Sequence, residues 1–535
     1  MTPVPRMARS GYDGGHPRRA HVVAVIAEPE ELTVPRLHGL TAVADALEVR
    51  ADLVGDPDPY LLRRYFKGPL VYGLRSSRHG GGSRAGPIER RTRLLRAAAH
   101  YDLVDLEAMD DLLPEMLARI PARQRRISWH SPEPGRPGPC VDDDPLEAAR
   151  ALWWRFVVMA ATPAALYLIE SSAACHGSAS PQLLTGVKRA DVTAFASGPA
   201  GTWTRVLAPW LGAPVVFGRV GAPGADGMPS IGQLLADYGL PALPPLRFLL
   251  GIAGSAPGRS LSPRLHNAAL RHLRLPALYL PFQVDSLPRF WQWATGLGAP
   301  AALPLRGLTV TAPHKQNAVD VADVADREAL RSGAANLLWY DGERWRAATT
   351  DPFAALSALD LAGVDPGGRS AAVIGCGGAG RAVASALRGA GGRVTLVNRG
   401  EVNGREASAR LRLPYVPLSR FSPAGHTLLV HATPLVEQEP FPVADVEPDA
   451  VVMEMAYRDR PTALMSAVRA RGLLGIDGWD ILFAEVREQF RLLTGHPMPE
   501  ELPLRSLCPG PHPPDVLALT SPAPQPARPS SGEAP

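Results

Sequence analysis

Short apolar runs alternate with helix-like stretches along most of the chain. Between residues 20 and 245 these runs lie at 21–26, 70–74, 101–106, 127–129, 192–195 and 215–218. Repeated strand–helix units on this scale are typical of a parallel (β/α)8 barrel. A proline-rich segment at 241–245 then leads into a second α/β region that ends near Leu504. The pattern predicts an α/β protein with an N-terminal barrel followed by a second α/β unit.

The two ends of the chain lack this pattern. Residues 1–20 are polar and rich in glycine and arginine, and the tail from Pro509 is rich in proline and serine. Both compositions predict disorder because they offer little apolar surface to bury. The most apolar segment, 152–169, contains Arg155 and Pro163, so no stretch of the sequence is typical of a membrane span.

Composition narrows the class further. A chain of 535 residues with 46% apolar residues is too long for one compact core and predicts two or three domains. The net charge of +4 comes without a concentrated basic tract, which gives no case for a nucleic-acid partner. The four cysteines form no CxxC pair, which argues against a disulfide framework or a structural metal site and predicts a reducing cytoplasm. They are Cys140, Cys175, Cys376 and Cys508.

The strongest local motif is a glycine-rich turn between an apolar strand and an alanine-rich helix. The run 371–374 leads into Gly375-Cys-Gly377-Gly378-Ala379-Gly380 and then into a helical stretch. Glycines in this setting allow a tight turn and the close approach of a pyrophosphate, which the amides of the helix N-terminus can bind. The next strand ends in Asn398-Arg399, without the acidic residue that binds a ribose 2′-hydroxyl. The motif therefore predicts NADP as the cofactor.

Lysine is rare in this sequence, which draws attention to Lys315. Only Lys67 and Lys188 accompany it, while arginine supplies the other positive charges. Lys315 follows an apolar, β-type run closed by Pro313, where a strand end meets a loop. A guanidinium holds its proton near neutral pH, whereas a lysine in a cleft can have its pKa lowered enough to exchange one. Lys315 is therefore a candidate acid–base group.

Residues 247–505 resemble the shikimate dehydrogenase family over the whole length of that region. The matching motifs are Ser260-Leu-Ser262, Thr309-Val-Thr311-Ala-Pro-His-Lys315, Gly333-Ala-Ala-Asn336, Thr350-Asp351, Asn398-Arg399, His431-Ala-Thr433-Pro, Tyr457 and Ile476-Asp-Gly478. The resemblance implies that Lys315 and Asp351 are catalytic. It assigns substrate binding to Ser260, Ser262, Thr311, Asn336, Tyr457 and Glu485. It assigns NADP binding to Gly375, Gly377, Gly378, Ala379, Gly380, Asn398, Arg399, Thr433 and Gly478.

Several positions depart from the family pattern. The family has asparagine where Thr309 and Thr349 stand, and glycine where Ala354 and Val436 stand. It has glutamine where Glu485 stands, and an ionised carboxylate can only accept hydrogen bonds. The choice among shikimate, quinate and an amino analogue therefore stays open, although the reaction type does not.

The first region resembles type I 3-dehydroquinate dehydratase, a (β/α)8 barrel that uses a Schiff-base lysine and a histidine. His130 matches the histidine, and Arg50, Arg75 and Arg205 match anion-binding arginines. The segment 156–162 aligns with the Schiff-base strand, which puts Val158 at the position of the amine; another register would favour Lys188. Further departures are His79 in place of a glutamate, and Gly224 and Met228 in the substrate-closing loop.

These features predict an NADP-dependent shikimate dehydrogenase of aromatic amino acid and chorismate biosynthesis, cytoplasmic and without a metal. Its dehydratase-like barrel is expected to be inactive. Two alternatives stay open: a bifunctional dehydratase/dehydrogenase, and a non-catalytic sensor of shikimate-pathway metabolites. The predicted units are a disordered segment 1–20, the barrel 21–245, a substrate-binding domain 246–351, a Rossmann domain 352–480, a returning helix 481–508 and a disordered tail 509–535.

Overall fold

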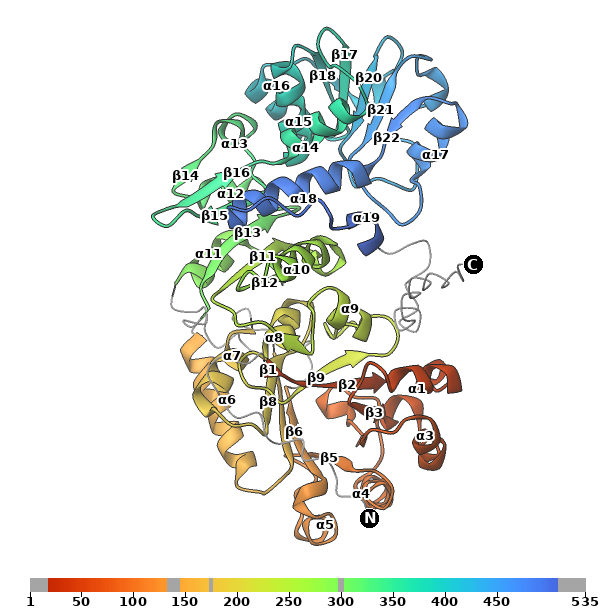
Figure 1. The fold of residues 1–535 in the computed structure, drawn as a ribbon, viewed down its shortest axis with the longest axis vertical. Helices are drawn as coiled ribbons and strands as arrows, with labels where there is room; N and C mark the ends of the chain where they lie inside the picture. The colour runs from red at the N-terminus through yellow and green to blue at the C-terminus, as the bar shows by residue number, and fades with distance from the viewer. Residues whose placement is uncertain (1–17, 132–144, 173–176, 297–302, 509–535) are drawn as a thin grey trace, which may run out of the picture.

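A computed structural model describes residues 18–131, 145–172, 177–296 and 303–508 of the protein. The predicted disorder of residues 1–17 and 509–535, as well as Cys140 and Cys175, lies outside the described residues. Three large sheets follow one another along the long axis of the molecule (Figure 1). Within the described ranges, no helix is both long and apolar enough to cross a membrane.

The N-terminal unit is a nearly closed barrel of eight parallel strands in the order β8-β7-β6-β5-β4-β3-β2-β9. The strands are β2 (His21–Ile26), β3 (Ala46–Arg50), β4 (Leu70–Gly73), β5 (Leu103–Glu107), β6 (Arg125–His130), β7 (Leu166–Ser171), β8 (Val192–Ala196) and β9 (Val215–Arg219). Every residue of β3 to β8 is buried, as expected for parallel strands covered on both faces. The charged side chains on these strands must therefore find partners within the barrel.

Helices surround the barrel. They are α1 (Val34–Leu40), α2 (Ala51–Val54), α3 (Pro59–Tyr65), α4 (Pro87–Ala97), α5 (Pro114–Arg119), α6 (Pro145–Ala160), α7 (Ala179–Val187), α8 (Thr202–Leu207) and α9 (Ile231–Ala236). A short pair, β1 (Arg18–Arg19) with β10 (Ala242–Leu243), closes the unit where the chain enters and leaves. The sequence-based prediction of a barrel is confirmed.

The predicted position of the Schiff-base strand is wrong. Val158 lies in helix α6, and its side chain is 72% exposed. The strand that pairs with β6 is β7, which begins eight residues later, and it places Glu170 in register with His130. The apolar run across 152–169 contains parts of a helix and of a strand, which hydrophobicity alone does not separate.

The second unit is a six-stranded mixed sheet in the order β12-β11-β13-β15-β16-β14. Its strands are β11 (Phe248–Gly254), β12 (Ala277–Gln283), β13 (Leu305–Val310), β14 (Val324–Ala325), β15 (Leu337–Tyr340) and β16 (Trp345–Ala348). Its helices are α10 (Ser262–His272), α11 (Leu287–Thr295), α12 (Asn317–Asp320) and α13 (Arg327–Ser332).

The third unit is a six-stranded parallel sheet in the order β19-β18-β17-β20-β21-β22. This is the 3-2-1-4-5-6 order of doubly wound dinucleotide-binding folds, as the glycine-rich turn predicts. The strands are β17 (Ser370–Ile374), β18 (Arg393–Asn398), β19 (Tyr415–Pro417), β20 (Leu428–His431), β21 (Val451–Glu454) and β22 (Leu474–Ile476). The helices are α14 (Asp351–Leu361), α15 (Gly378–Gly389), α16 (Glu401–Leu411), α17 (Ala463–Ala470), α18 (Gly478–Thr494) and α19 (Leu504–Leu507). Helix α18 leaves this sheet and returns to pack on α10 and α14 (Figure 1).

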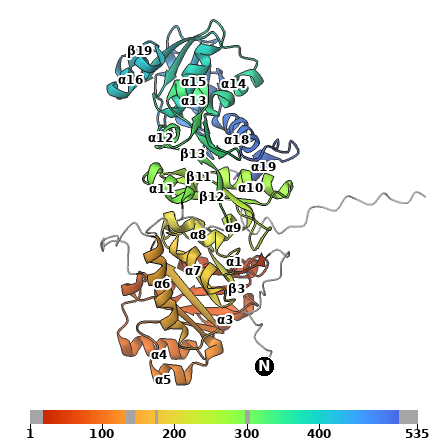
Figure 2. The same ribbon diagram turned by 90° about the vertical axis from the view of Figure 1, so that its left-hand side faces the viewer.

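Aromatic packing joins the barrel to the second sheet. Trp203 of α8 is 1% exposed, and its ring centroid lies 5.7 Å from that of Phe282 on β12. Figure 2 shows α8 directly beneath β12. An ion pair adds to this contact, because Arg264 on α10 bonds to Asp237 just after α9 at 2.5 Å. The barrel and the substrate sheet therefore share one hydrophobic core.

We expect Trp203→Ala to lower the free energy of unfolding by about 3–5 kcal/mol, because it removes a fully buried aromatic ring from this shared core. Urea unfolding followed by circular dichroism measures the change. Trp154→Ala is the matched control, since Trp154 on α6 is 68% exposed. Equal losses in the two variants would contradict a shared core at this contact.

Candidate functional site

Lys315 and Asp351 meet where the second and third units join. Lys315 lies in the loop after β13, and Asp351 is the first residue of α14. The Lys315 Nζ donates to both carboxylate oxygens of Asp351, at 2.9 and 2.7 Å. Burial alone would lower the pKa of Lys315, but the charges of Asp351 and Glu485 outweigh it and raise that pKa. The pKa of Lys315 is therefore raised and not lowered as the sequence suggests, so the lysine stays protonated and can donate its proton.

Asn336 and Glu485 complete the polar cluster around this pair. The buried Asn336 amide donates to Glu485 Oε1 at 2.9 Å and to Asp351 Oδ1 at 3.2 Å, and its carbonyl accepts from the Thr350 amide at 2.8 Å. Gln489, one turn further along α18, donates to the same Glu485 oxygen at 2.7 Å. Burial and the nearby Asp351 charge raise the pKa of Glu485 to about 7, against the opposing effect of Lys315.

The two predicted serines lie at the start of α10. Ser260 Oγ donates to Ser262 Oγ at 3.0 Å. Tyr457 lies close enough to Ser260 for a hydrogen bond, and burial together with the Glu485 charge raises the pKa of Tyr457. The predicted residue Thr311 is half-buried just after β13, and its amide donates to the Ala253 carbonyl at 2.9 Å. Tyr457 interacts with both Ser260 and the Glu485 charge, which places the Ser260 hydroxyl near the polar cluster.

The glycine-rich turn lies against the lysine. A Cβ added at Gly378 would come within 2.9 Å of the Lys315 Cβ, and one added at Gly380 would lie 1.9 Å from the Gly375 carbonyl oxygen. Gly375 also has a φ of +116°, a conformation that favours glycine. The turn thus needs glycine for its own closure and for contact with the lysine. Gly377 caps the 12-residue helix α15, in which Ala379 is half-buried.

The remaining predicted cofactor residues lie at or just after the carboxyl ends of β18, β20 and β22. Asn398, at the end of β18, accepts from the Cys376 amide at 3.1 Å and so fixes the turn. The next residue, Arg399, is exposed. Thr433 Oγ1 lies 2.6 Å from His431 Nε2 after β20. Gly478, the first residue of α18, lies so close to the Ala456 carbonyl that a Cβ would be 2.3 Å from its oxygen.

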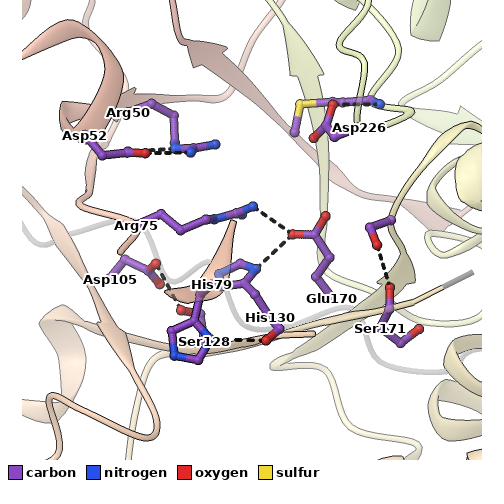
Figure 3. Close-up of polar contacts among 12 residues, drawn as sticks. Arg50, Asp52, Arg75, His79, Asp105, Ser128, His130, Glu170, Ser171 and Asp226 are labelled. Atoms are coloured by element: carbon purple, nitrogen blue, oxygen red, sulfur yellow. Dashed lines mark hydrogen bonds and ion pairs between the residues drawn. The ribbon is translucent and has the colours of Figure 1, made fainter. Parts of the chain in front are cut away.

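A second polar cluster lies at the carboxyl ends of the barrel strands, where barrel enzymes carry their active sites. His130 Nδ1 lies 2.8 Å from Glu170 Oε2, and Arg75 Nη1 lies 3.1 Å from the same oxygen (Figure 3). Arg205 donates to Glu170 Oε1 at 2.8 Å, and Arg50 forms two hydrogen bonds with Asp52, at 2.9 and 2.7 Å. The structure brings together the histidine and two of the arginines singled out in the sequence, Arg75 and Arg205, around a carboxylate that sequence reasoning missed.

Lys188 is far from this cluster along the barrel axis. It ends α7, just before β8, and is exposed, so it lies at the amino ends of the strands. His79 Nε2 lies 3.5 Å from Asp110 Oδ2. Met228 is buried, and its amide donates to Asp226 Oδ1. Glu170, Gln489 and Tyr279 are the functional-site neighbours that the sequence did not single out. One signal in the sequence could have identified Glu170. Side chains alternate between the two faces of a strand, and this alternation along 166–171 would have pointed Glu170 into the barrel.

Comparisons with known proteins follow the division of the chain. Residues 21–241 match the model of type I 3-dehydroquinase, and residues 252–338 match the shikimate dehydrogenase substrate binding domain. The shikimate dehydrogenase (NADP(+)) of Syntrophobacter fumaroxidans is 34% identical over 261 residues, covering 47% of this chain and 89% of that protein. The chloroplastic bifunctional 3-dehydroquinate dehydratase/shikimate dehydrogenase of Arabidopsis thaliana is 26% identical over 494 residues, covering 86% of this chain and 79% of that protein. A crystal structure of shikimate 5-dehydrogenase from Thermus thermophilus with NADP(H) and shikimate is 30% identical, covering 47% of this chain and 95% of that one, with a TM-score of 0.42.

The fold and the lysine–aspartate site beside a glycine-rich turn define a two-sheet dinucleotide-binding oxidoreductase joined to a (β/α)8 barrel. The chain belongs to the shikimate dehydrogenase family, and its first half is a type I 3-dehydroquinase domain.

Proposed function

We propose that the protein is an NADP-dependent shikimate dehydrogenase, which reversibly reduces 3-dehydroshikimate to shikimate, and that its barrel has no dehydratase activity. The observation that carries the first part is the Lys315–Asp351 pair in contact with the glycine-rich turn, at 2.7 Å between Nζ and Oδ2. A pure sensor of metabolites would not need a protonated amine at that position. The names of the relatives support the choice of substrate and cofactor.

The dinucleotide fits the residues present. The turn is so narrow that only glycine closes it at 375 and 380, the N-terminus of α15 can receive a pyrophosphate, and Arg399 can pair with a 2′-phosphate. When bound, NADP supplies or accepts the hydride. Lys315 donates its proton to the oxygen that develops negative charge, and Asp351 holds the ammonium in place. Ser260, Ser262 and Asn336 offer donors and acceptors to a small polyhydroxylated carboxylate.

We propose functional units at 21–245, 246–351, 352–480 and 481–508. Two free thiols among the described residues, Cys376 and Cys508, support a reducing compartment, which we take to be the cytoplasm.

Purified protein assayed for NADP reduction with shikimate, quinate and an amino analogue tests the function. Activity with none of the three substrates would refute it.

We expect Lys315→Ala and Asp351→Ala each to reduce kcat by about a hundredfold or more, as for groups that move or position a proton. Fluorescence titration with NADPH should give a Kd close to that of the wild type. Lys315→Arg should not restore turnover, because arginine keeps the charge but does not exchange a proton. Near-normal turnover in Lys315→Arg would mean that the lysine only positions the substrate.

We expect Arg399→Ala to raise KM for NADP roughly tenfold or more, because a charge-assisted hydrogen bond contributes about 1.5–3 kcal/mol. KM for NAD should change little, since NAD lacks the 2′-phosphate. Arg405→Ala is the matched control, as Arg405 is exposed on α16 and pairs with Glu401. Equal losses with both cofactors would contradict the role of Arg399.

The activity should depend on the ionisation of Glu485. Its pKa of about 7 means that raising the pH from 6 to 8 adds a negative charge beside Asp351, in a site proposed to receive an anionic substrate. KM for shikimate should therefore rise over this range in the wild type and stay flat in Glu485→Gln. The charged groups that face Glu485 are Lys315 and Asp351, with the phenols of Tyr279 and Tyr457 nearby.

Stability offers a readout that does not need turnover. The folded state holds the Glu485 proton above its usual pKa, so stability from this group is present at low pH and is lost as the pH rises towards 7. The Tm advantage of Glu485→Gln over the wild type should be larger at pH 8 than at pH 5. Glu488→Gln, on the same helix but paired with Arg491, should show no such trend. A pH-independent difference for Glu485→Gln would contradict the raised pKa.

We expect no conversion of 3-dehydroquinate to 3-dehydroshikimate, and no adduct after borohydride treatment with 3-dehydroquinate, as judged by intact-protein mass. Glu170 stands beside His130, and the exposed Lys188 and Lys67 leave no amine to form an imine there. A mass increase on Lys188 would restore the bifunctional interpretation.

A further inference from the structure

The carboxylate of Glu170 lies at the centre of the barrel mouth. It is on β7, in register with His130, and is 4% exposed. One oxygen lies within 2.8 Å of His130 Nδ1 and 3.1 Å of an Arg75 nitrogen, and the other accepts from Arg205 at 2.8 Å. Figure 3 shows Arg75 and His130 pointing at it from one side. Three donors on separate elements thus converge on one carboxylate.

The surrounding arginines are also satisfied by carboxylates of the chain. Besides the groups around Glu170, five carboxylates of the barrel unit pair with three arginines. The pairs are Arg50 with Asp52, Arg126 with Glu48 and Asp105, and Arg90 with Glu107 and Asp111, all with at least one contact of 3.1 Å or less. Among the described residues, each guanidinium of this cluster therefore has an acidic partner. Two guanidinium groups around a carboxylate are also the arrangement that proteins use to bind an external one.

The protonation states agree with this geometry. Burial alone would raise the pKa of Glu170, but Arg75, Arg205 and the hydrogen bond from His130 hold it well below its usual value. Burial and the Arg75 charge lower the pKa of His130 to about 4, so its ring is neutral at pH 7. A neutral ring that donates from Nδ1 to Glu170 leaves Nε2 as an acceptor, and this atom is buried without a partner among the described residues. Nε and Nη1 of Arg205 are likewise buried without a partner among the described residues. The Arg205 guanidinium lies over the Phe195 ring, 4.0 Å from the ring centroid.

We propose that the barrel mouth is a carboxylate-binding site that the chain fills itself: the Glu170 carboxylate is the built-in ligand of Arg75, Arg205 and His130. An external carboxylate that took the place of the Glu170 oxygens between these three groups would have to displace Glu170. The displaced carboxylate would then be buried without a cation, which is strongly unfavourable. The cluster therefore holds β4, β6, β7 and α8 together instead of binding a substrate. The ligand class of the site is a small carboxylate, admitted only when the side chain of residue 170 is shortened.

This inference rests on the part of the proposed function that gives the barrel no dehydratase activity, and it names what occupies the place of the substrate. It does not involve the dehydrogenase reaction of the other half. Binding in the barrel can therefore be tested by stability, whatever the dehydrogenase assay gives.

Chemical rescue tests the proposal. In the full-length protein, Glu170→Ala should lower Tm by several degrees, because it removes the carboxylate that pairs with the half-buried Arg75 and the buried Arg205. Sodium acetate should then restore about half of that loss or more, with saturation. Acetamide, which has the same shape without the charge, and sodium chloride at equal ionic strength should not. Acetate should have no saturable effect on the wild type.

Two variants act as controls. In Glu170→Ala/Arg205→Met the acetate effect should disappear, because one of the two guanidinium groups is gone. Asp226→Ala, which removes a more exposed carboxylate 3.5 Å from Arg205, should show no rescue. Oxidation of shikimate by NADP should be unchanged in Glu170→Ala, since Glu170 is outside the dehydrogenase site. If the wild type lacks that activity, the proposed function fails while the Tm measurement still decides this inference.

Acetate rescue of Tm that is equal in the wild type and in Glu170→Ala would overturn the proposal. If Glu170→Ala does not fold, the Tm values of Glu170→Asp and Glu170→Gln are compared instead. A shortened carboxylate that keeps more stability than the isosteric amide supports a ligand role for the charge. A Glu170→Gln variant as stable as the wild type overturns it.

Discussion

The contact of Lys315 with Asp351 and with the glycine-rich turn organises the dehydrogenase half. The lysine comes from the end of a strand in the second sheet, the aspartate opens the helix that leads to the third sheet, and Gly378 lies against the lysine stem. A protonated amine at this junction requires a carboxylate partner, and the turn requires a residue without a side chain. These two requirements fix how the two sheets approach each other. Asn336 and α18 then close the site around them.

The two halves of the chain treat buried carboxylates in opposite ways. In the barrel, Glu170 is matched by two arginines and a histidine, and it stays ionised. In the dehydrogenase site, Glu485 has two amide donors and shares a single lysine with Asp351. Its pKa is therefore raised to about 7. A buried carboxylate held by several cationic or hydrogen-bonding partners stays ionised, whereas one that shares a single cation with a second carboxylate titrates near neutral pH.

Much of this organisation could be predicted from the sequence, because the informative motifs are local. The glycine-rich turn, the strand before Lys315 and the run of barrel strands each carry their signal within about twenty residues. The Schiff-base position was misplaced because the helix and the strand within 152–169 are both apolar, so hydrophobicity gave no boundary between Val158 and β7. Glu170 was missed because its partners lie on other strands and on α8. The raised pKa of Lys315 likewise depends on Glu485, which is distant in sequence.

The aromatic contact between α8 and β12 gives the barrel a structural role that does not depend on catalysis. Phe282 lies on the edge strand of the substrate sheet, and Trp203 covers it. A dehydrogenase separated from its barrel would expose this aromatic face to water and to other copies of itself. In the full-length chain the barrel covers this aromatic face. The stabilising effect of this contact does not depend on any chemistry at the mouth of the barrel.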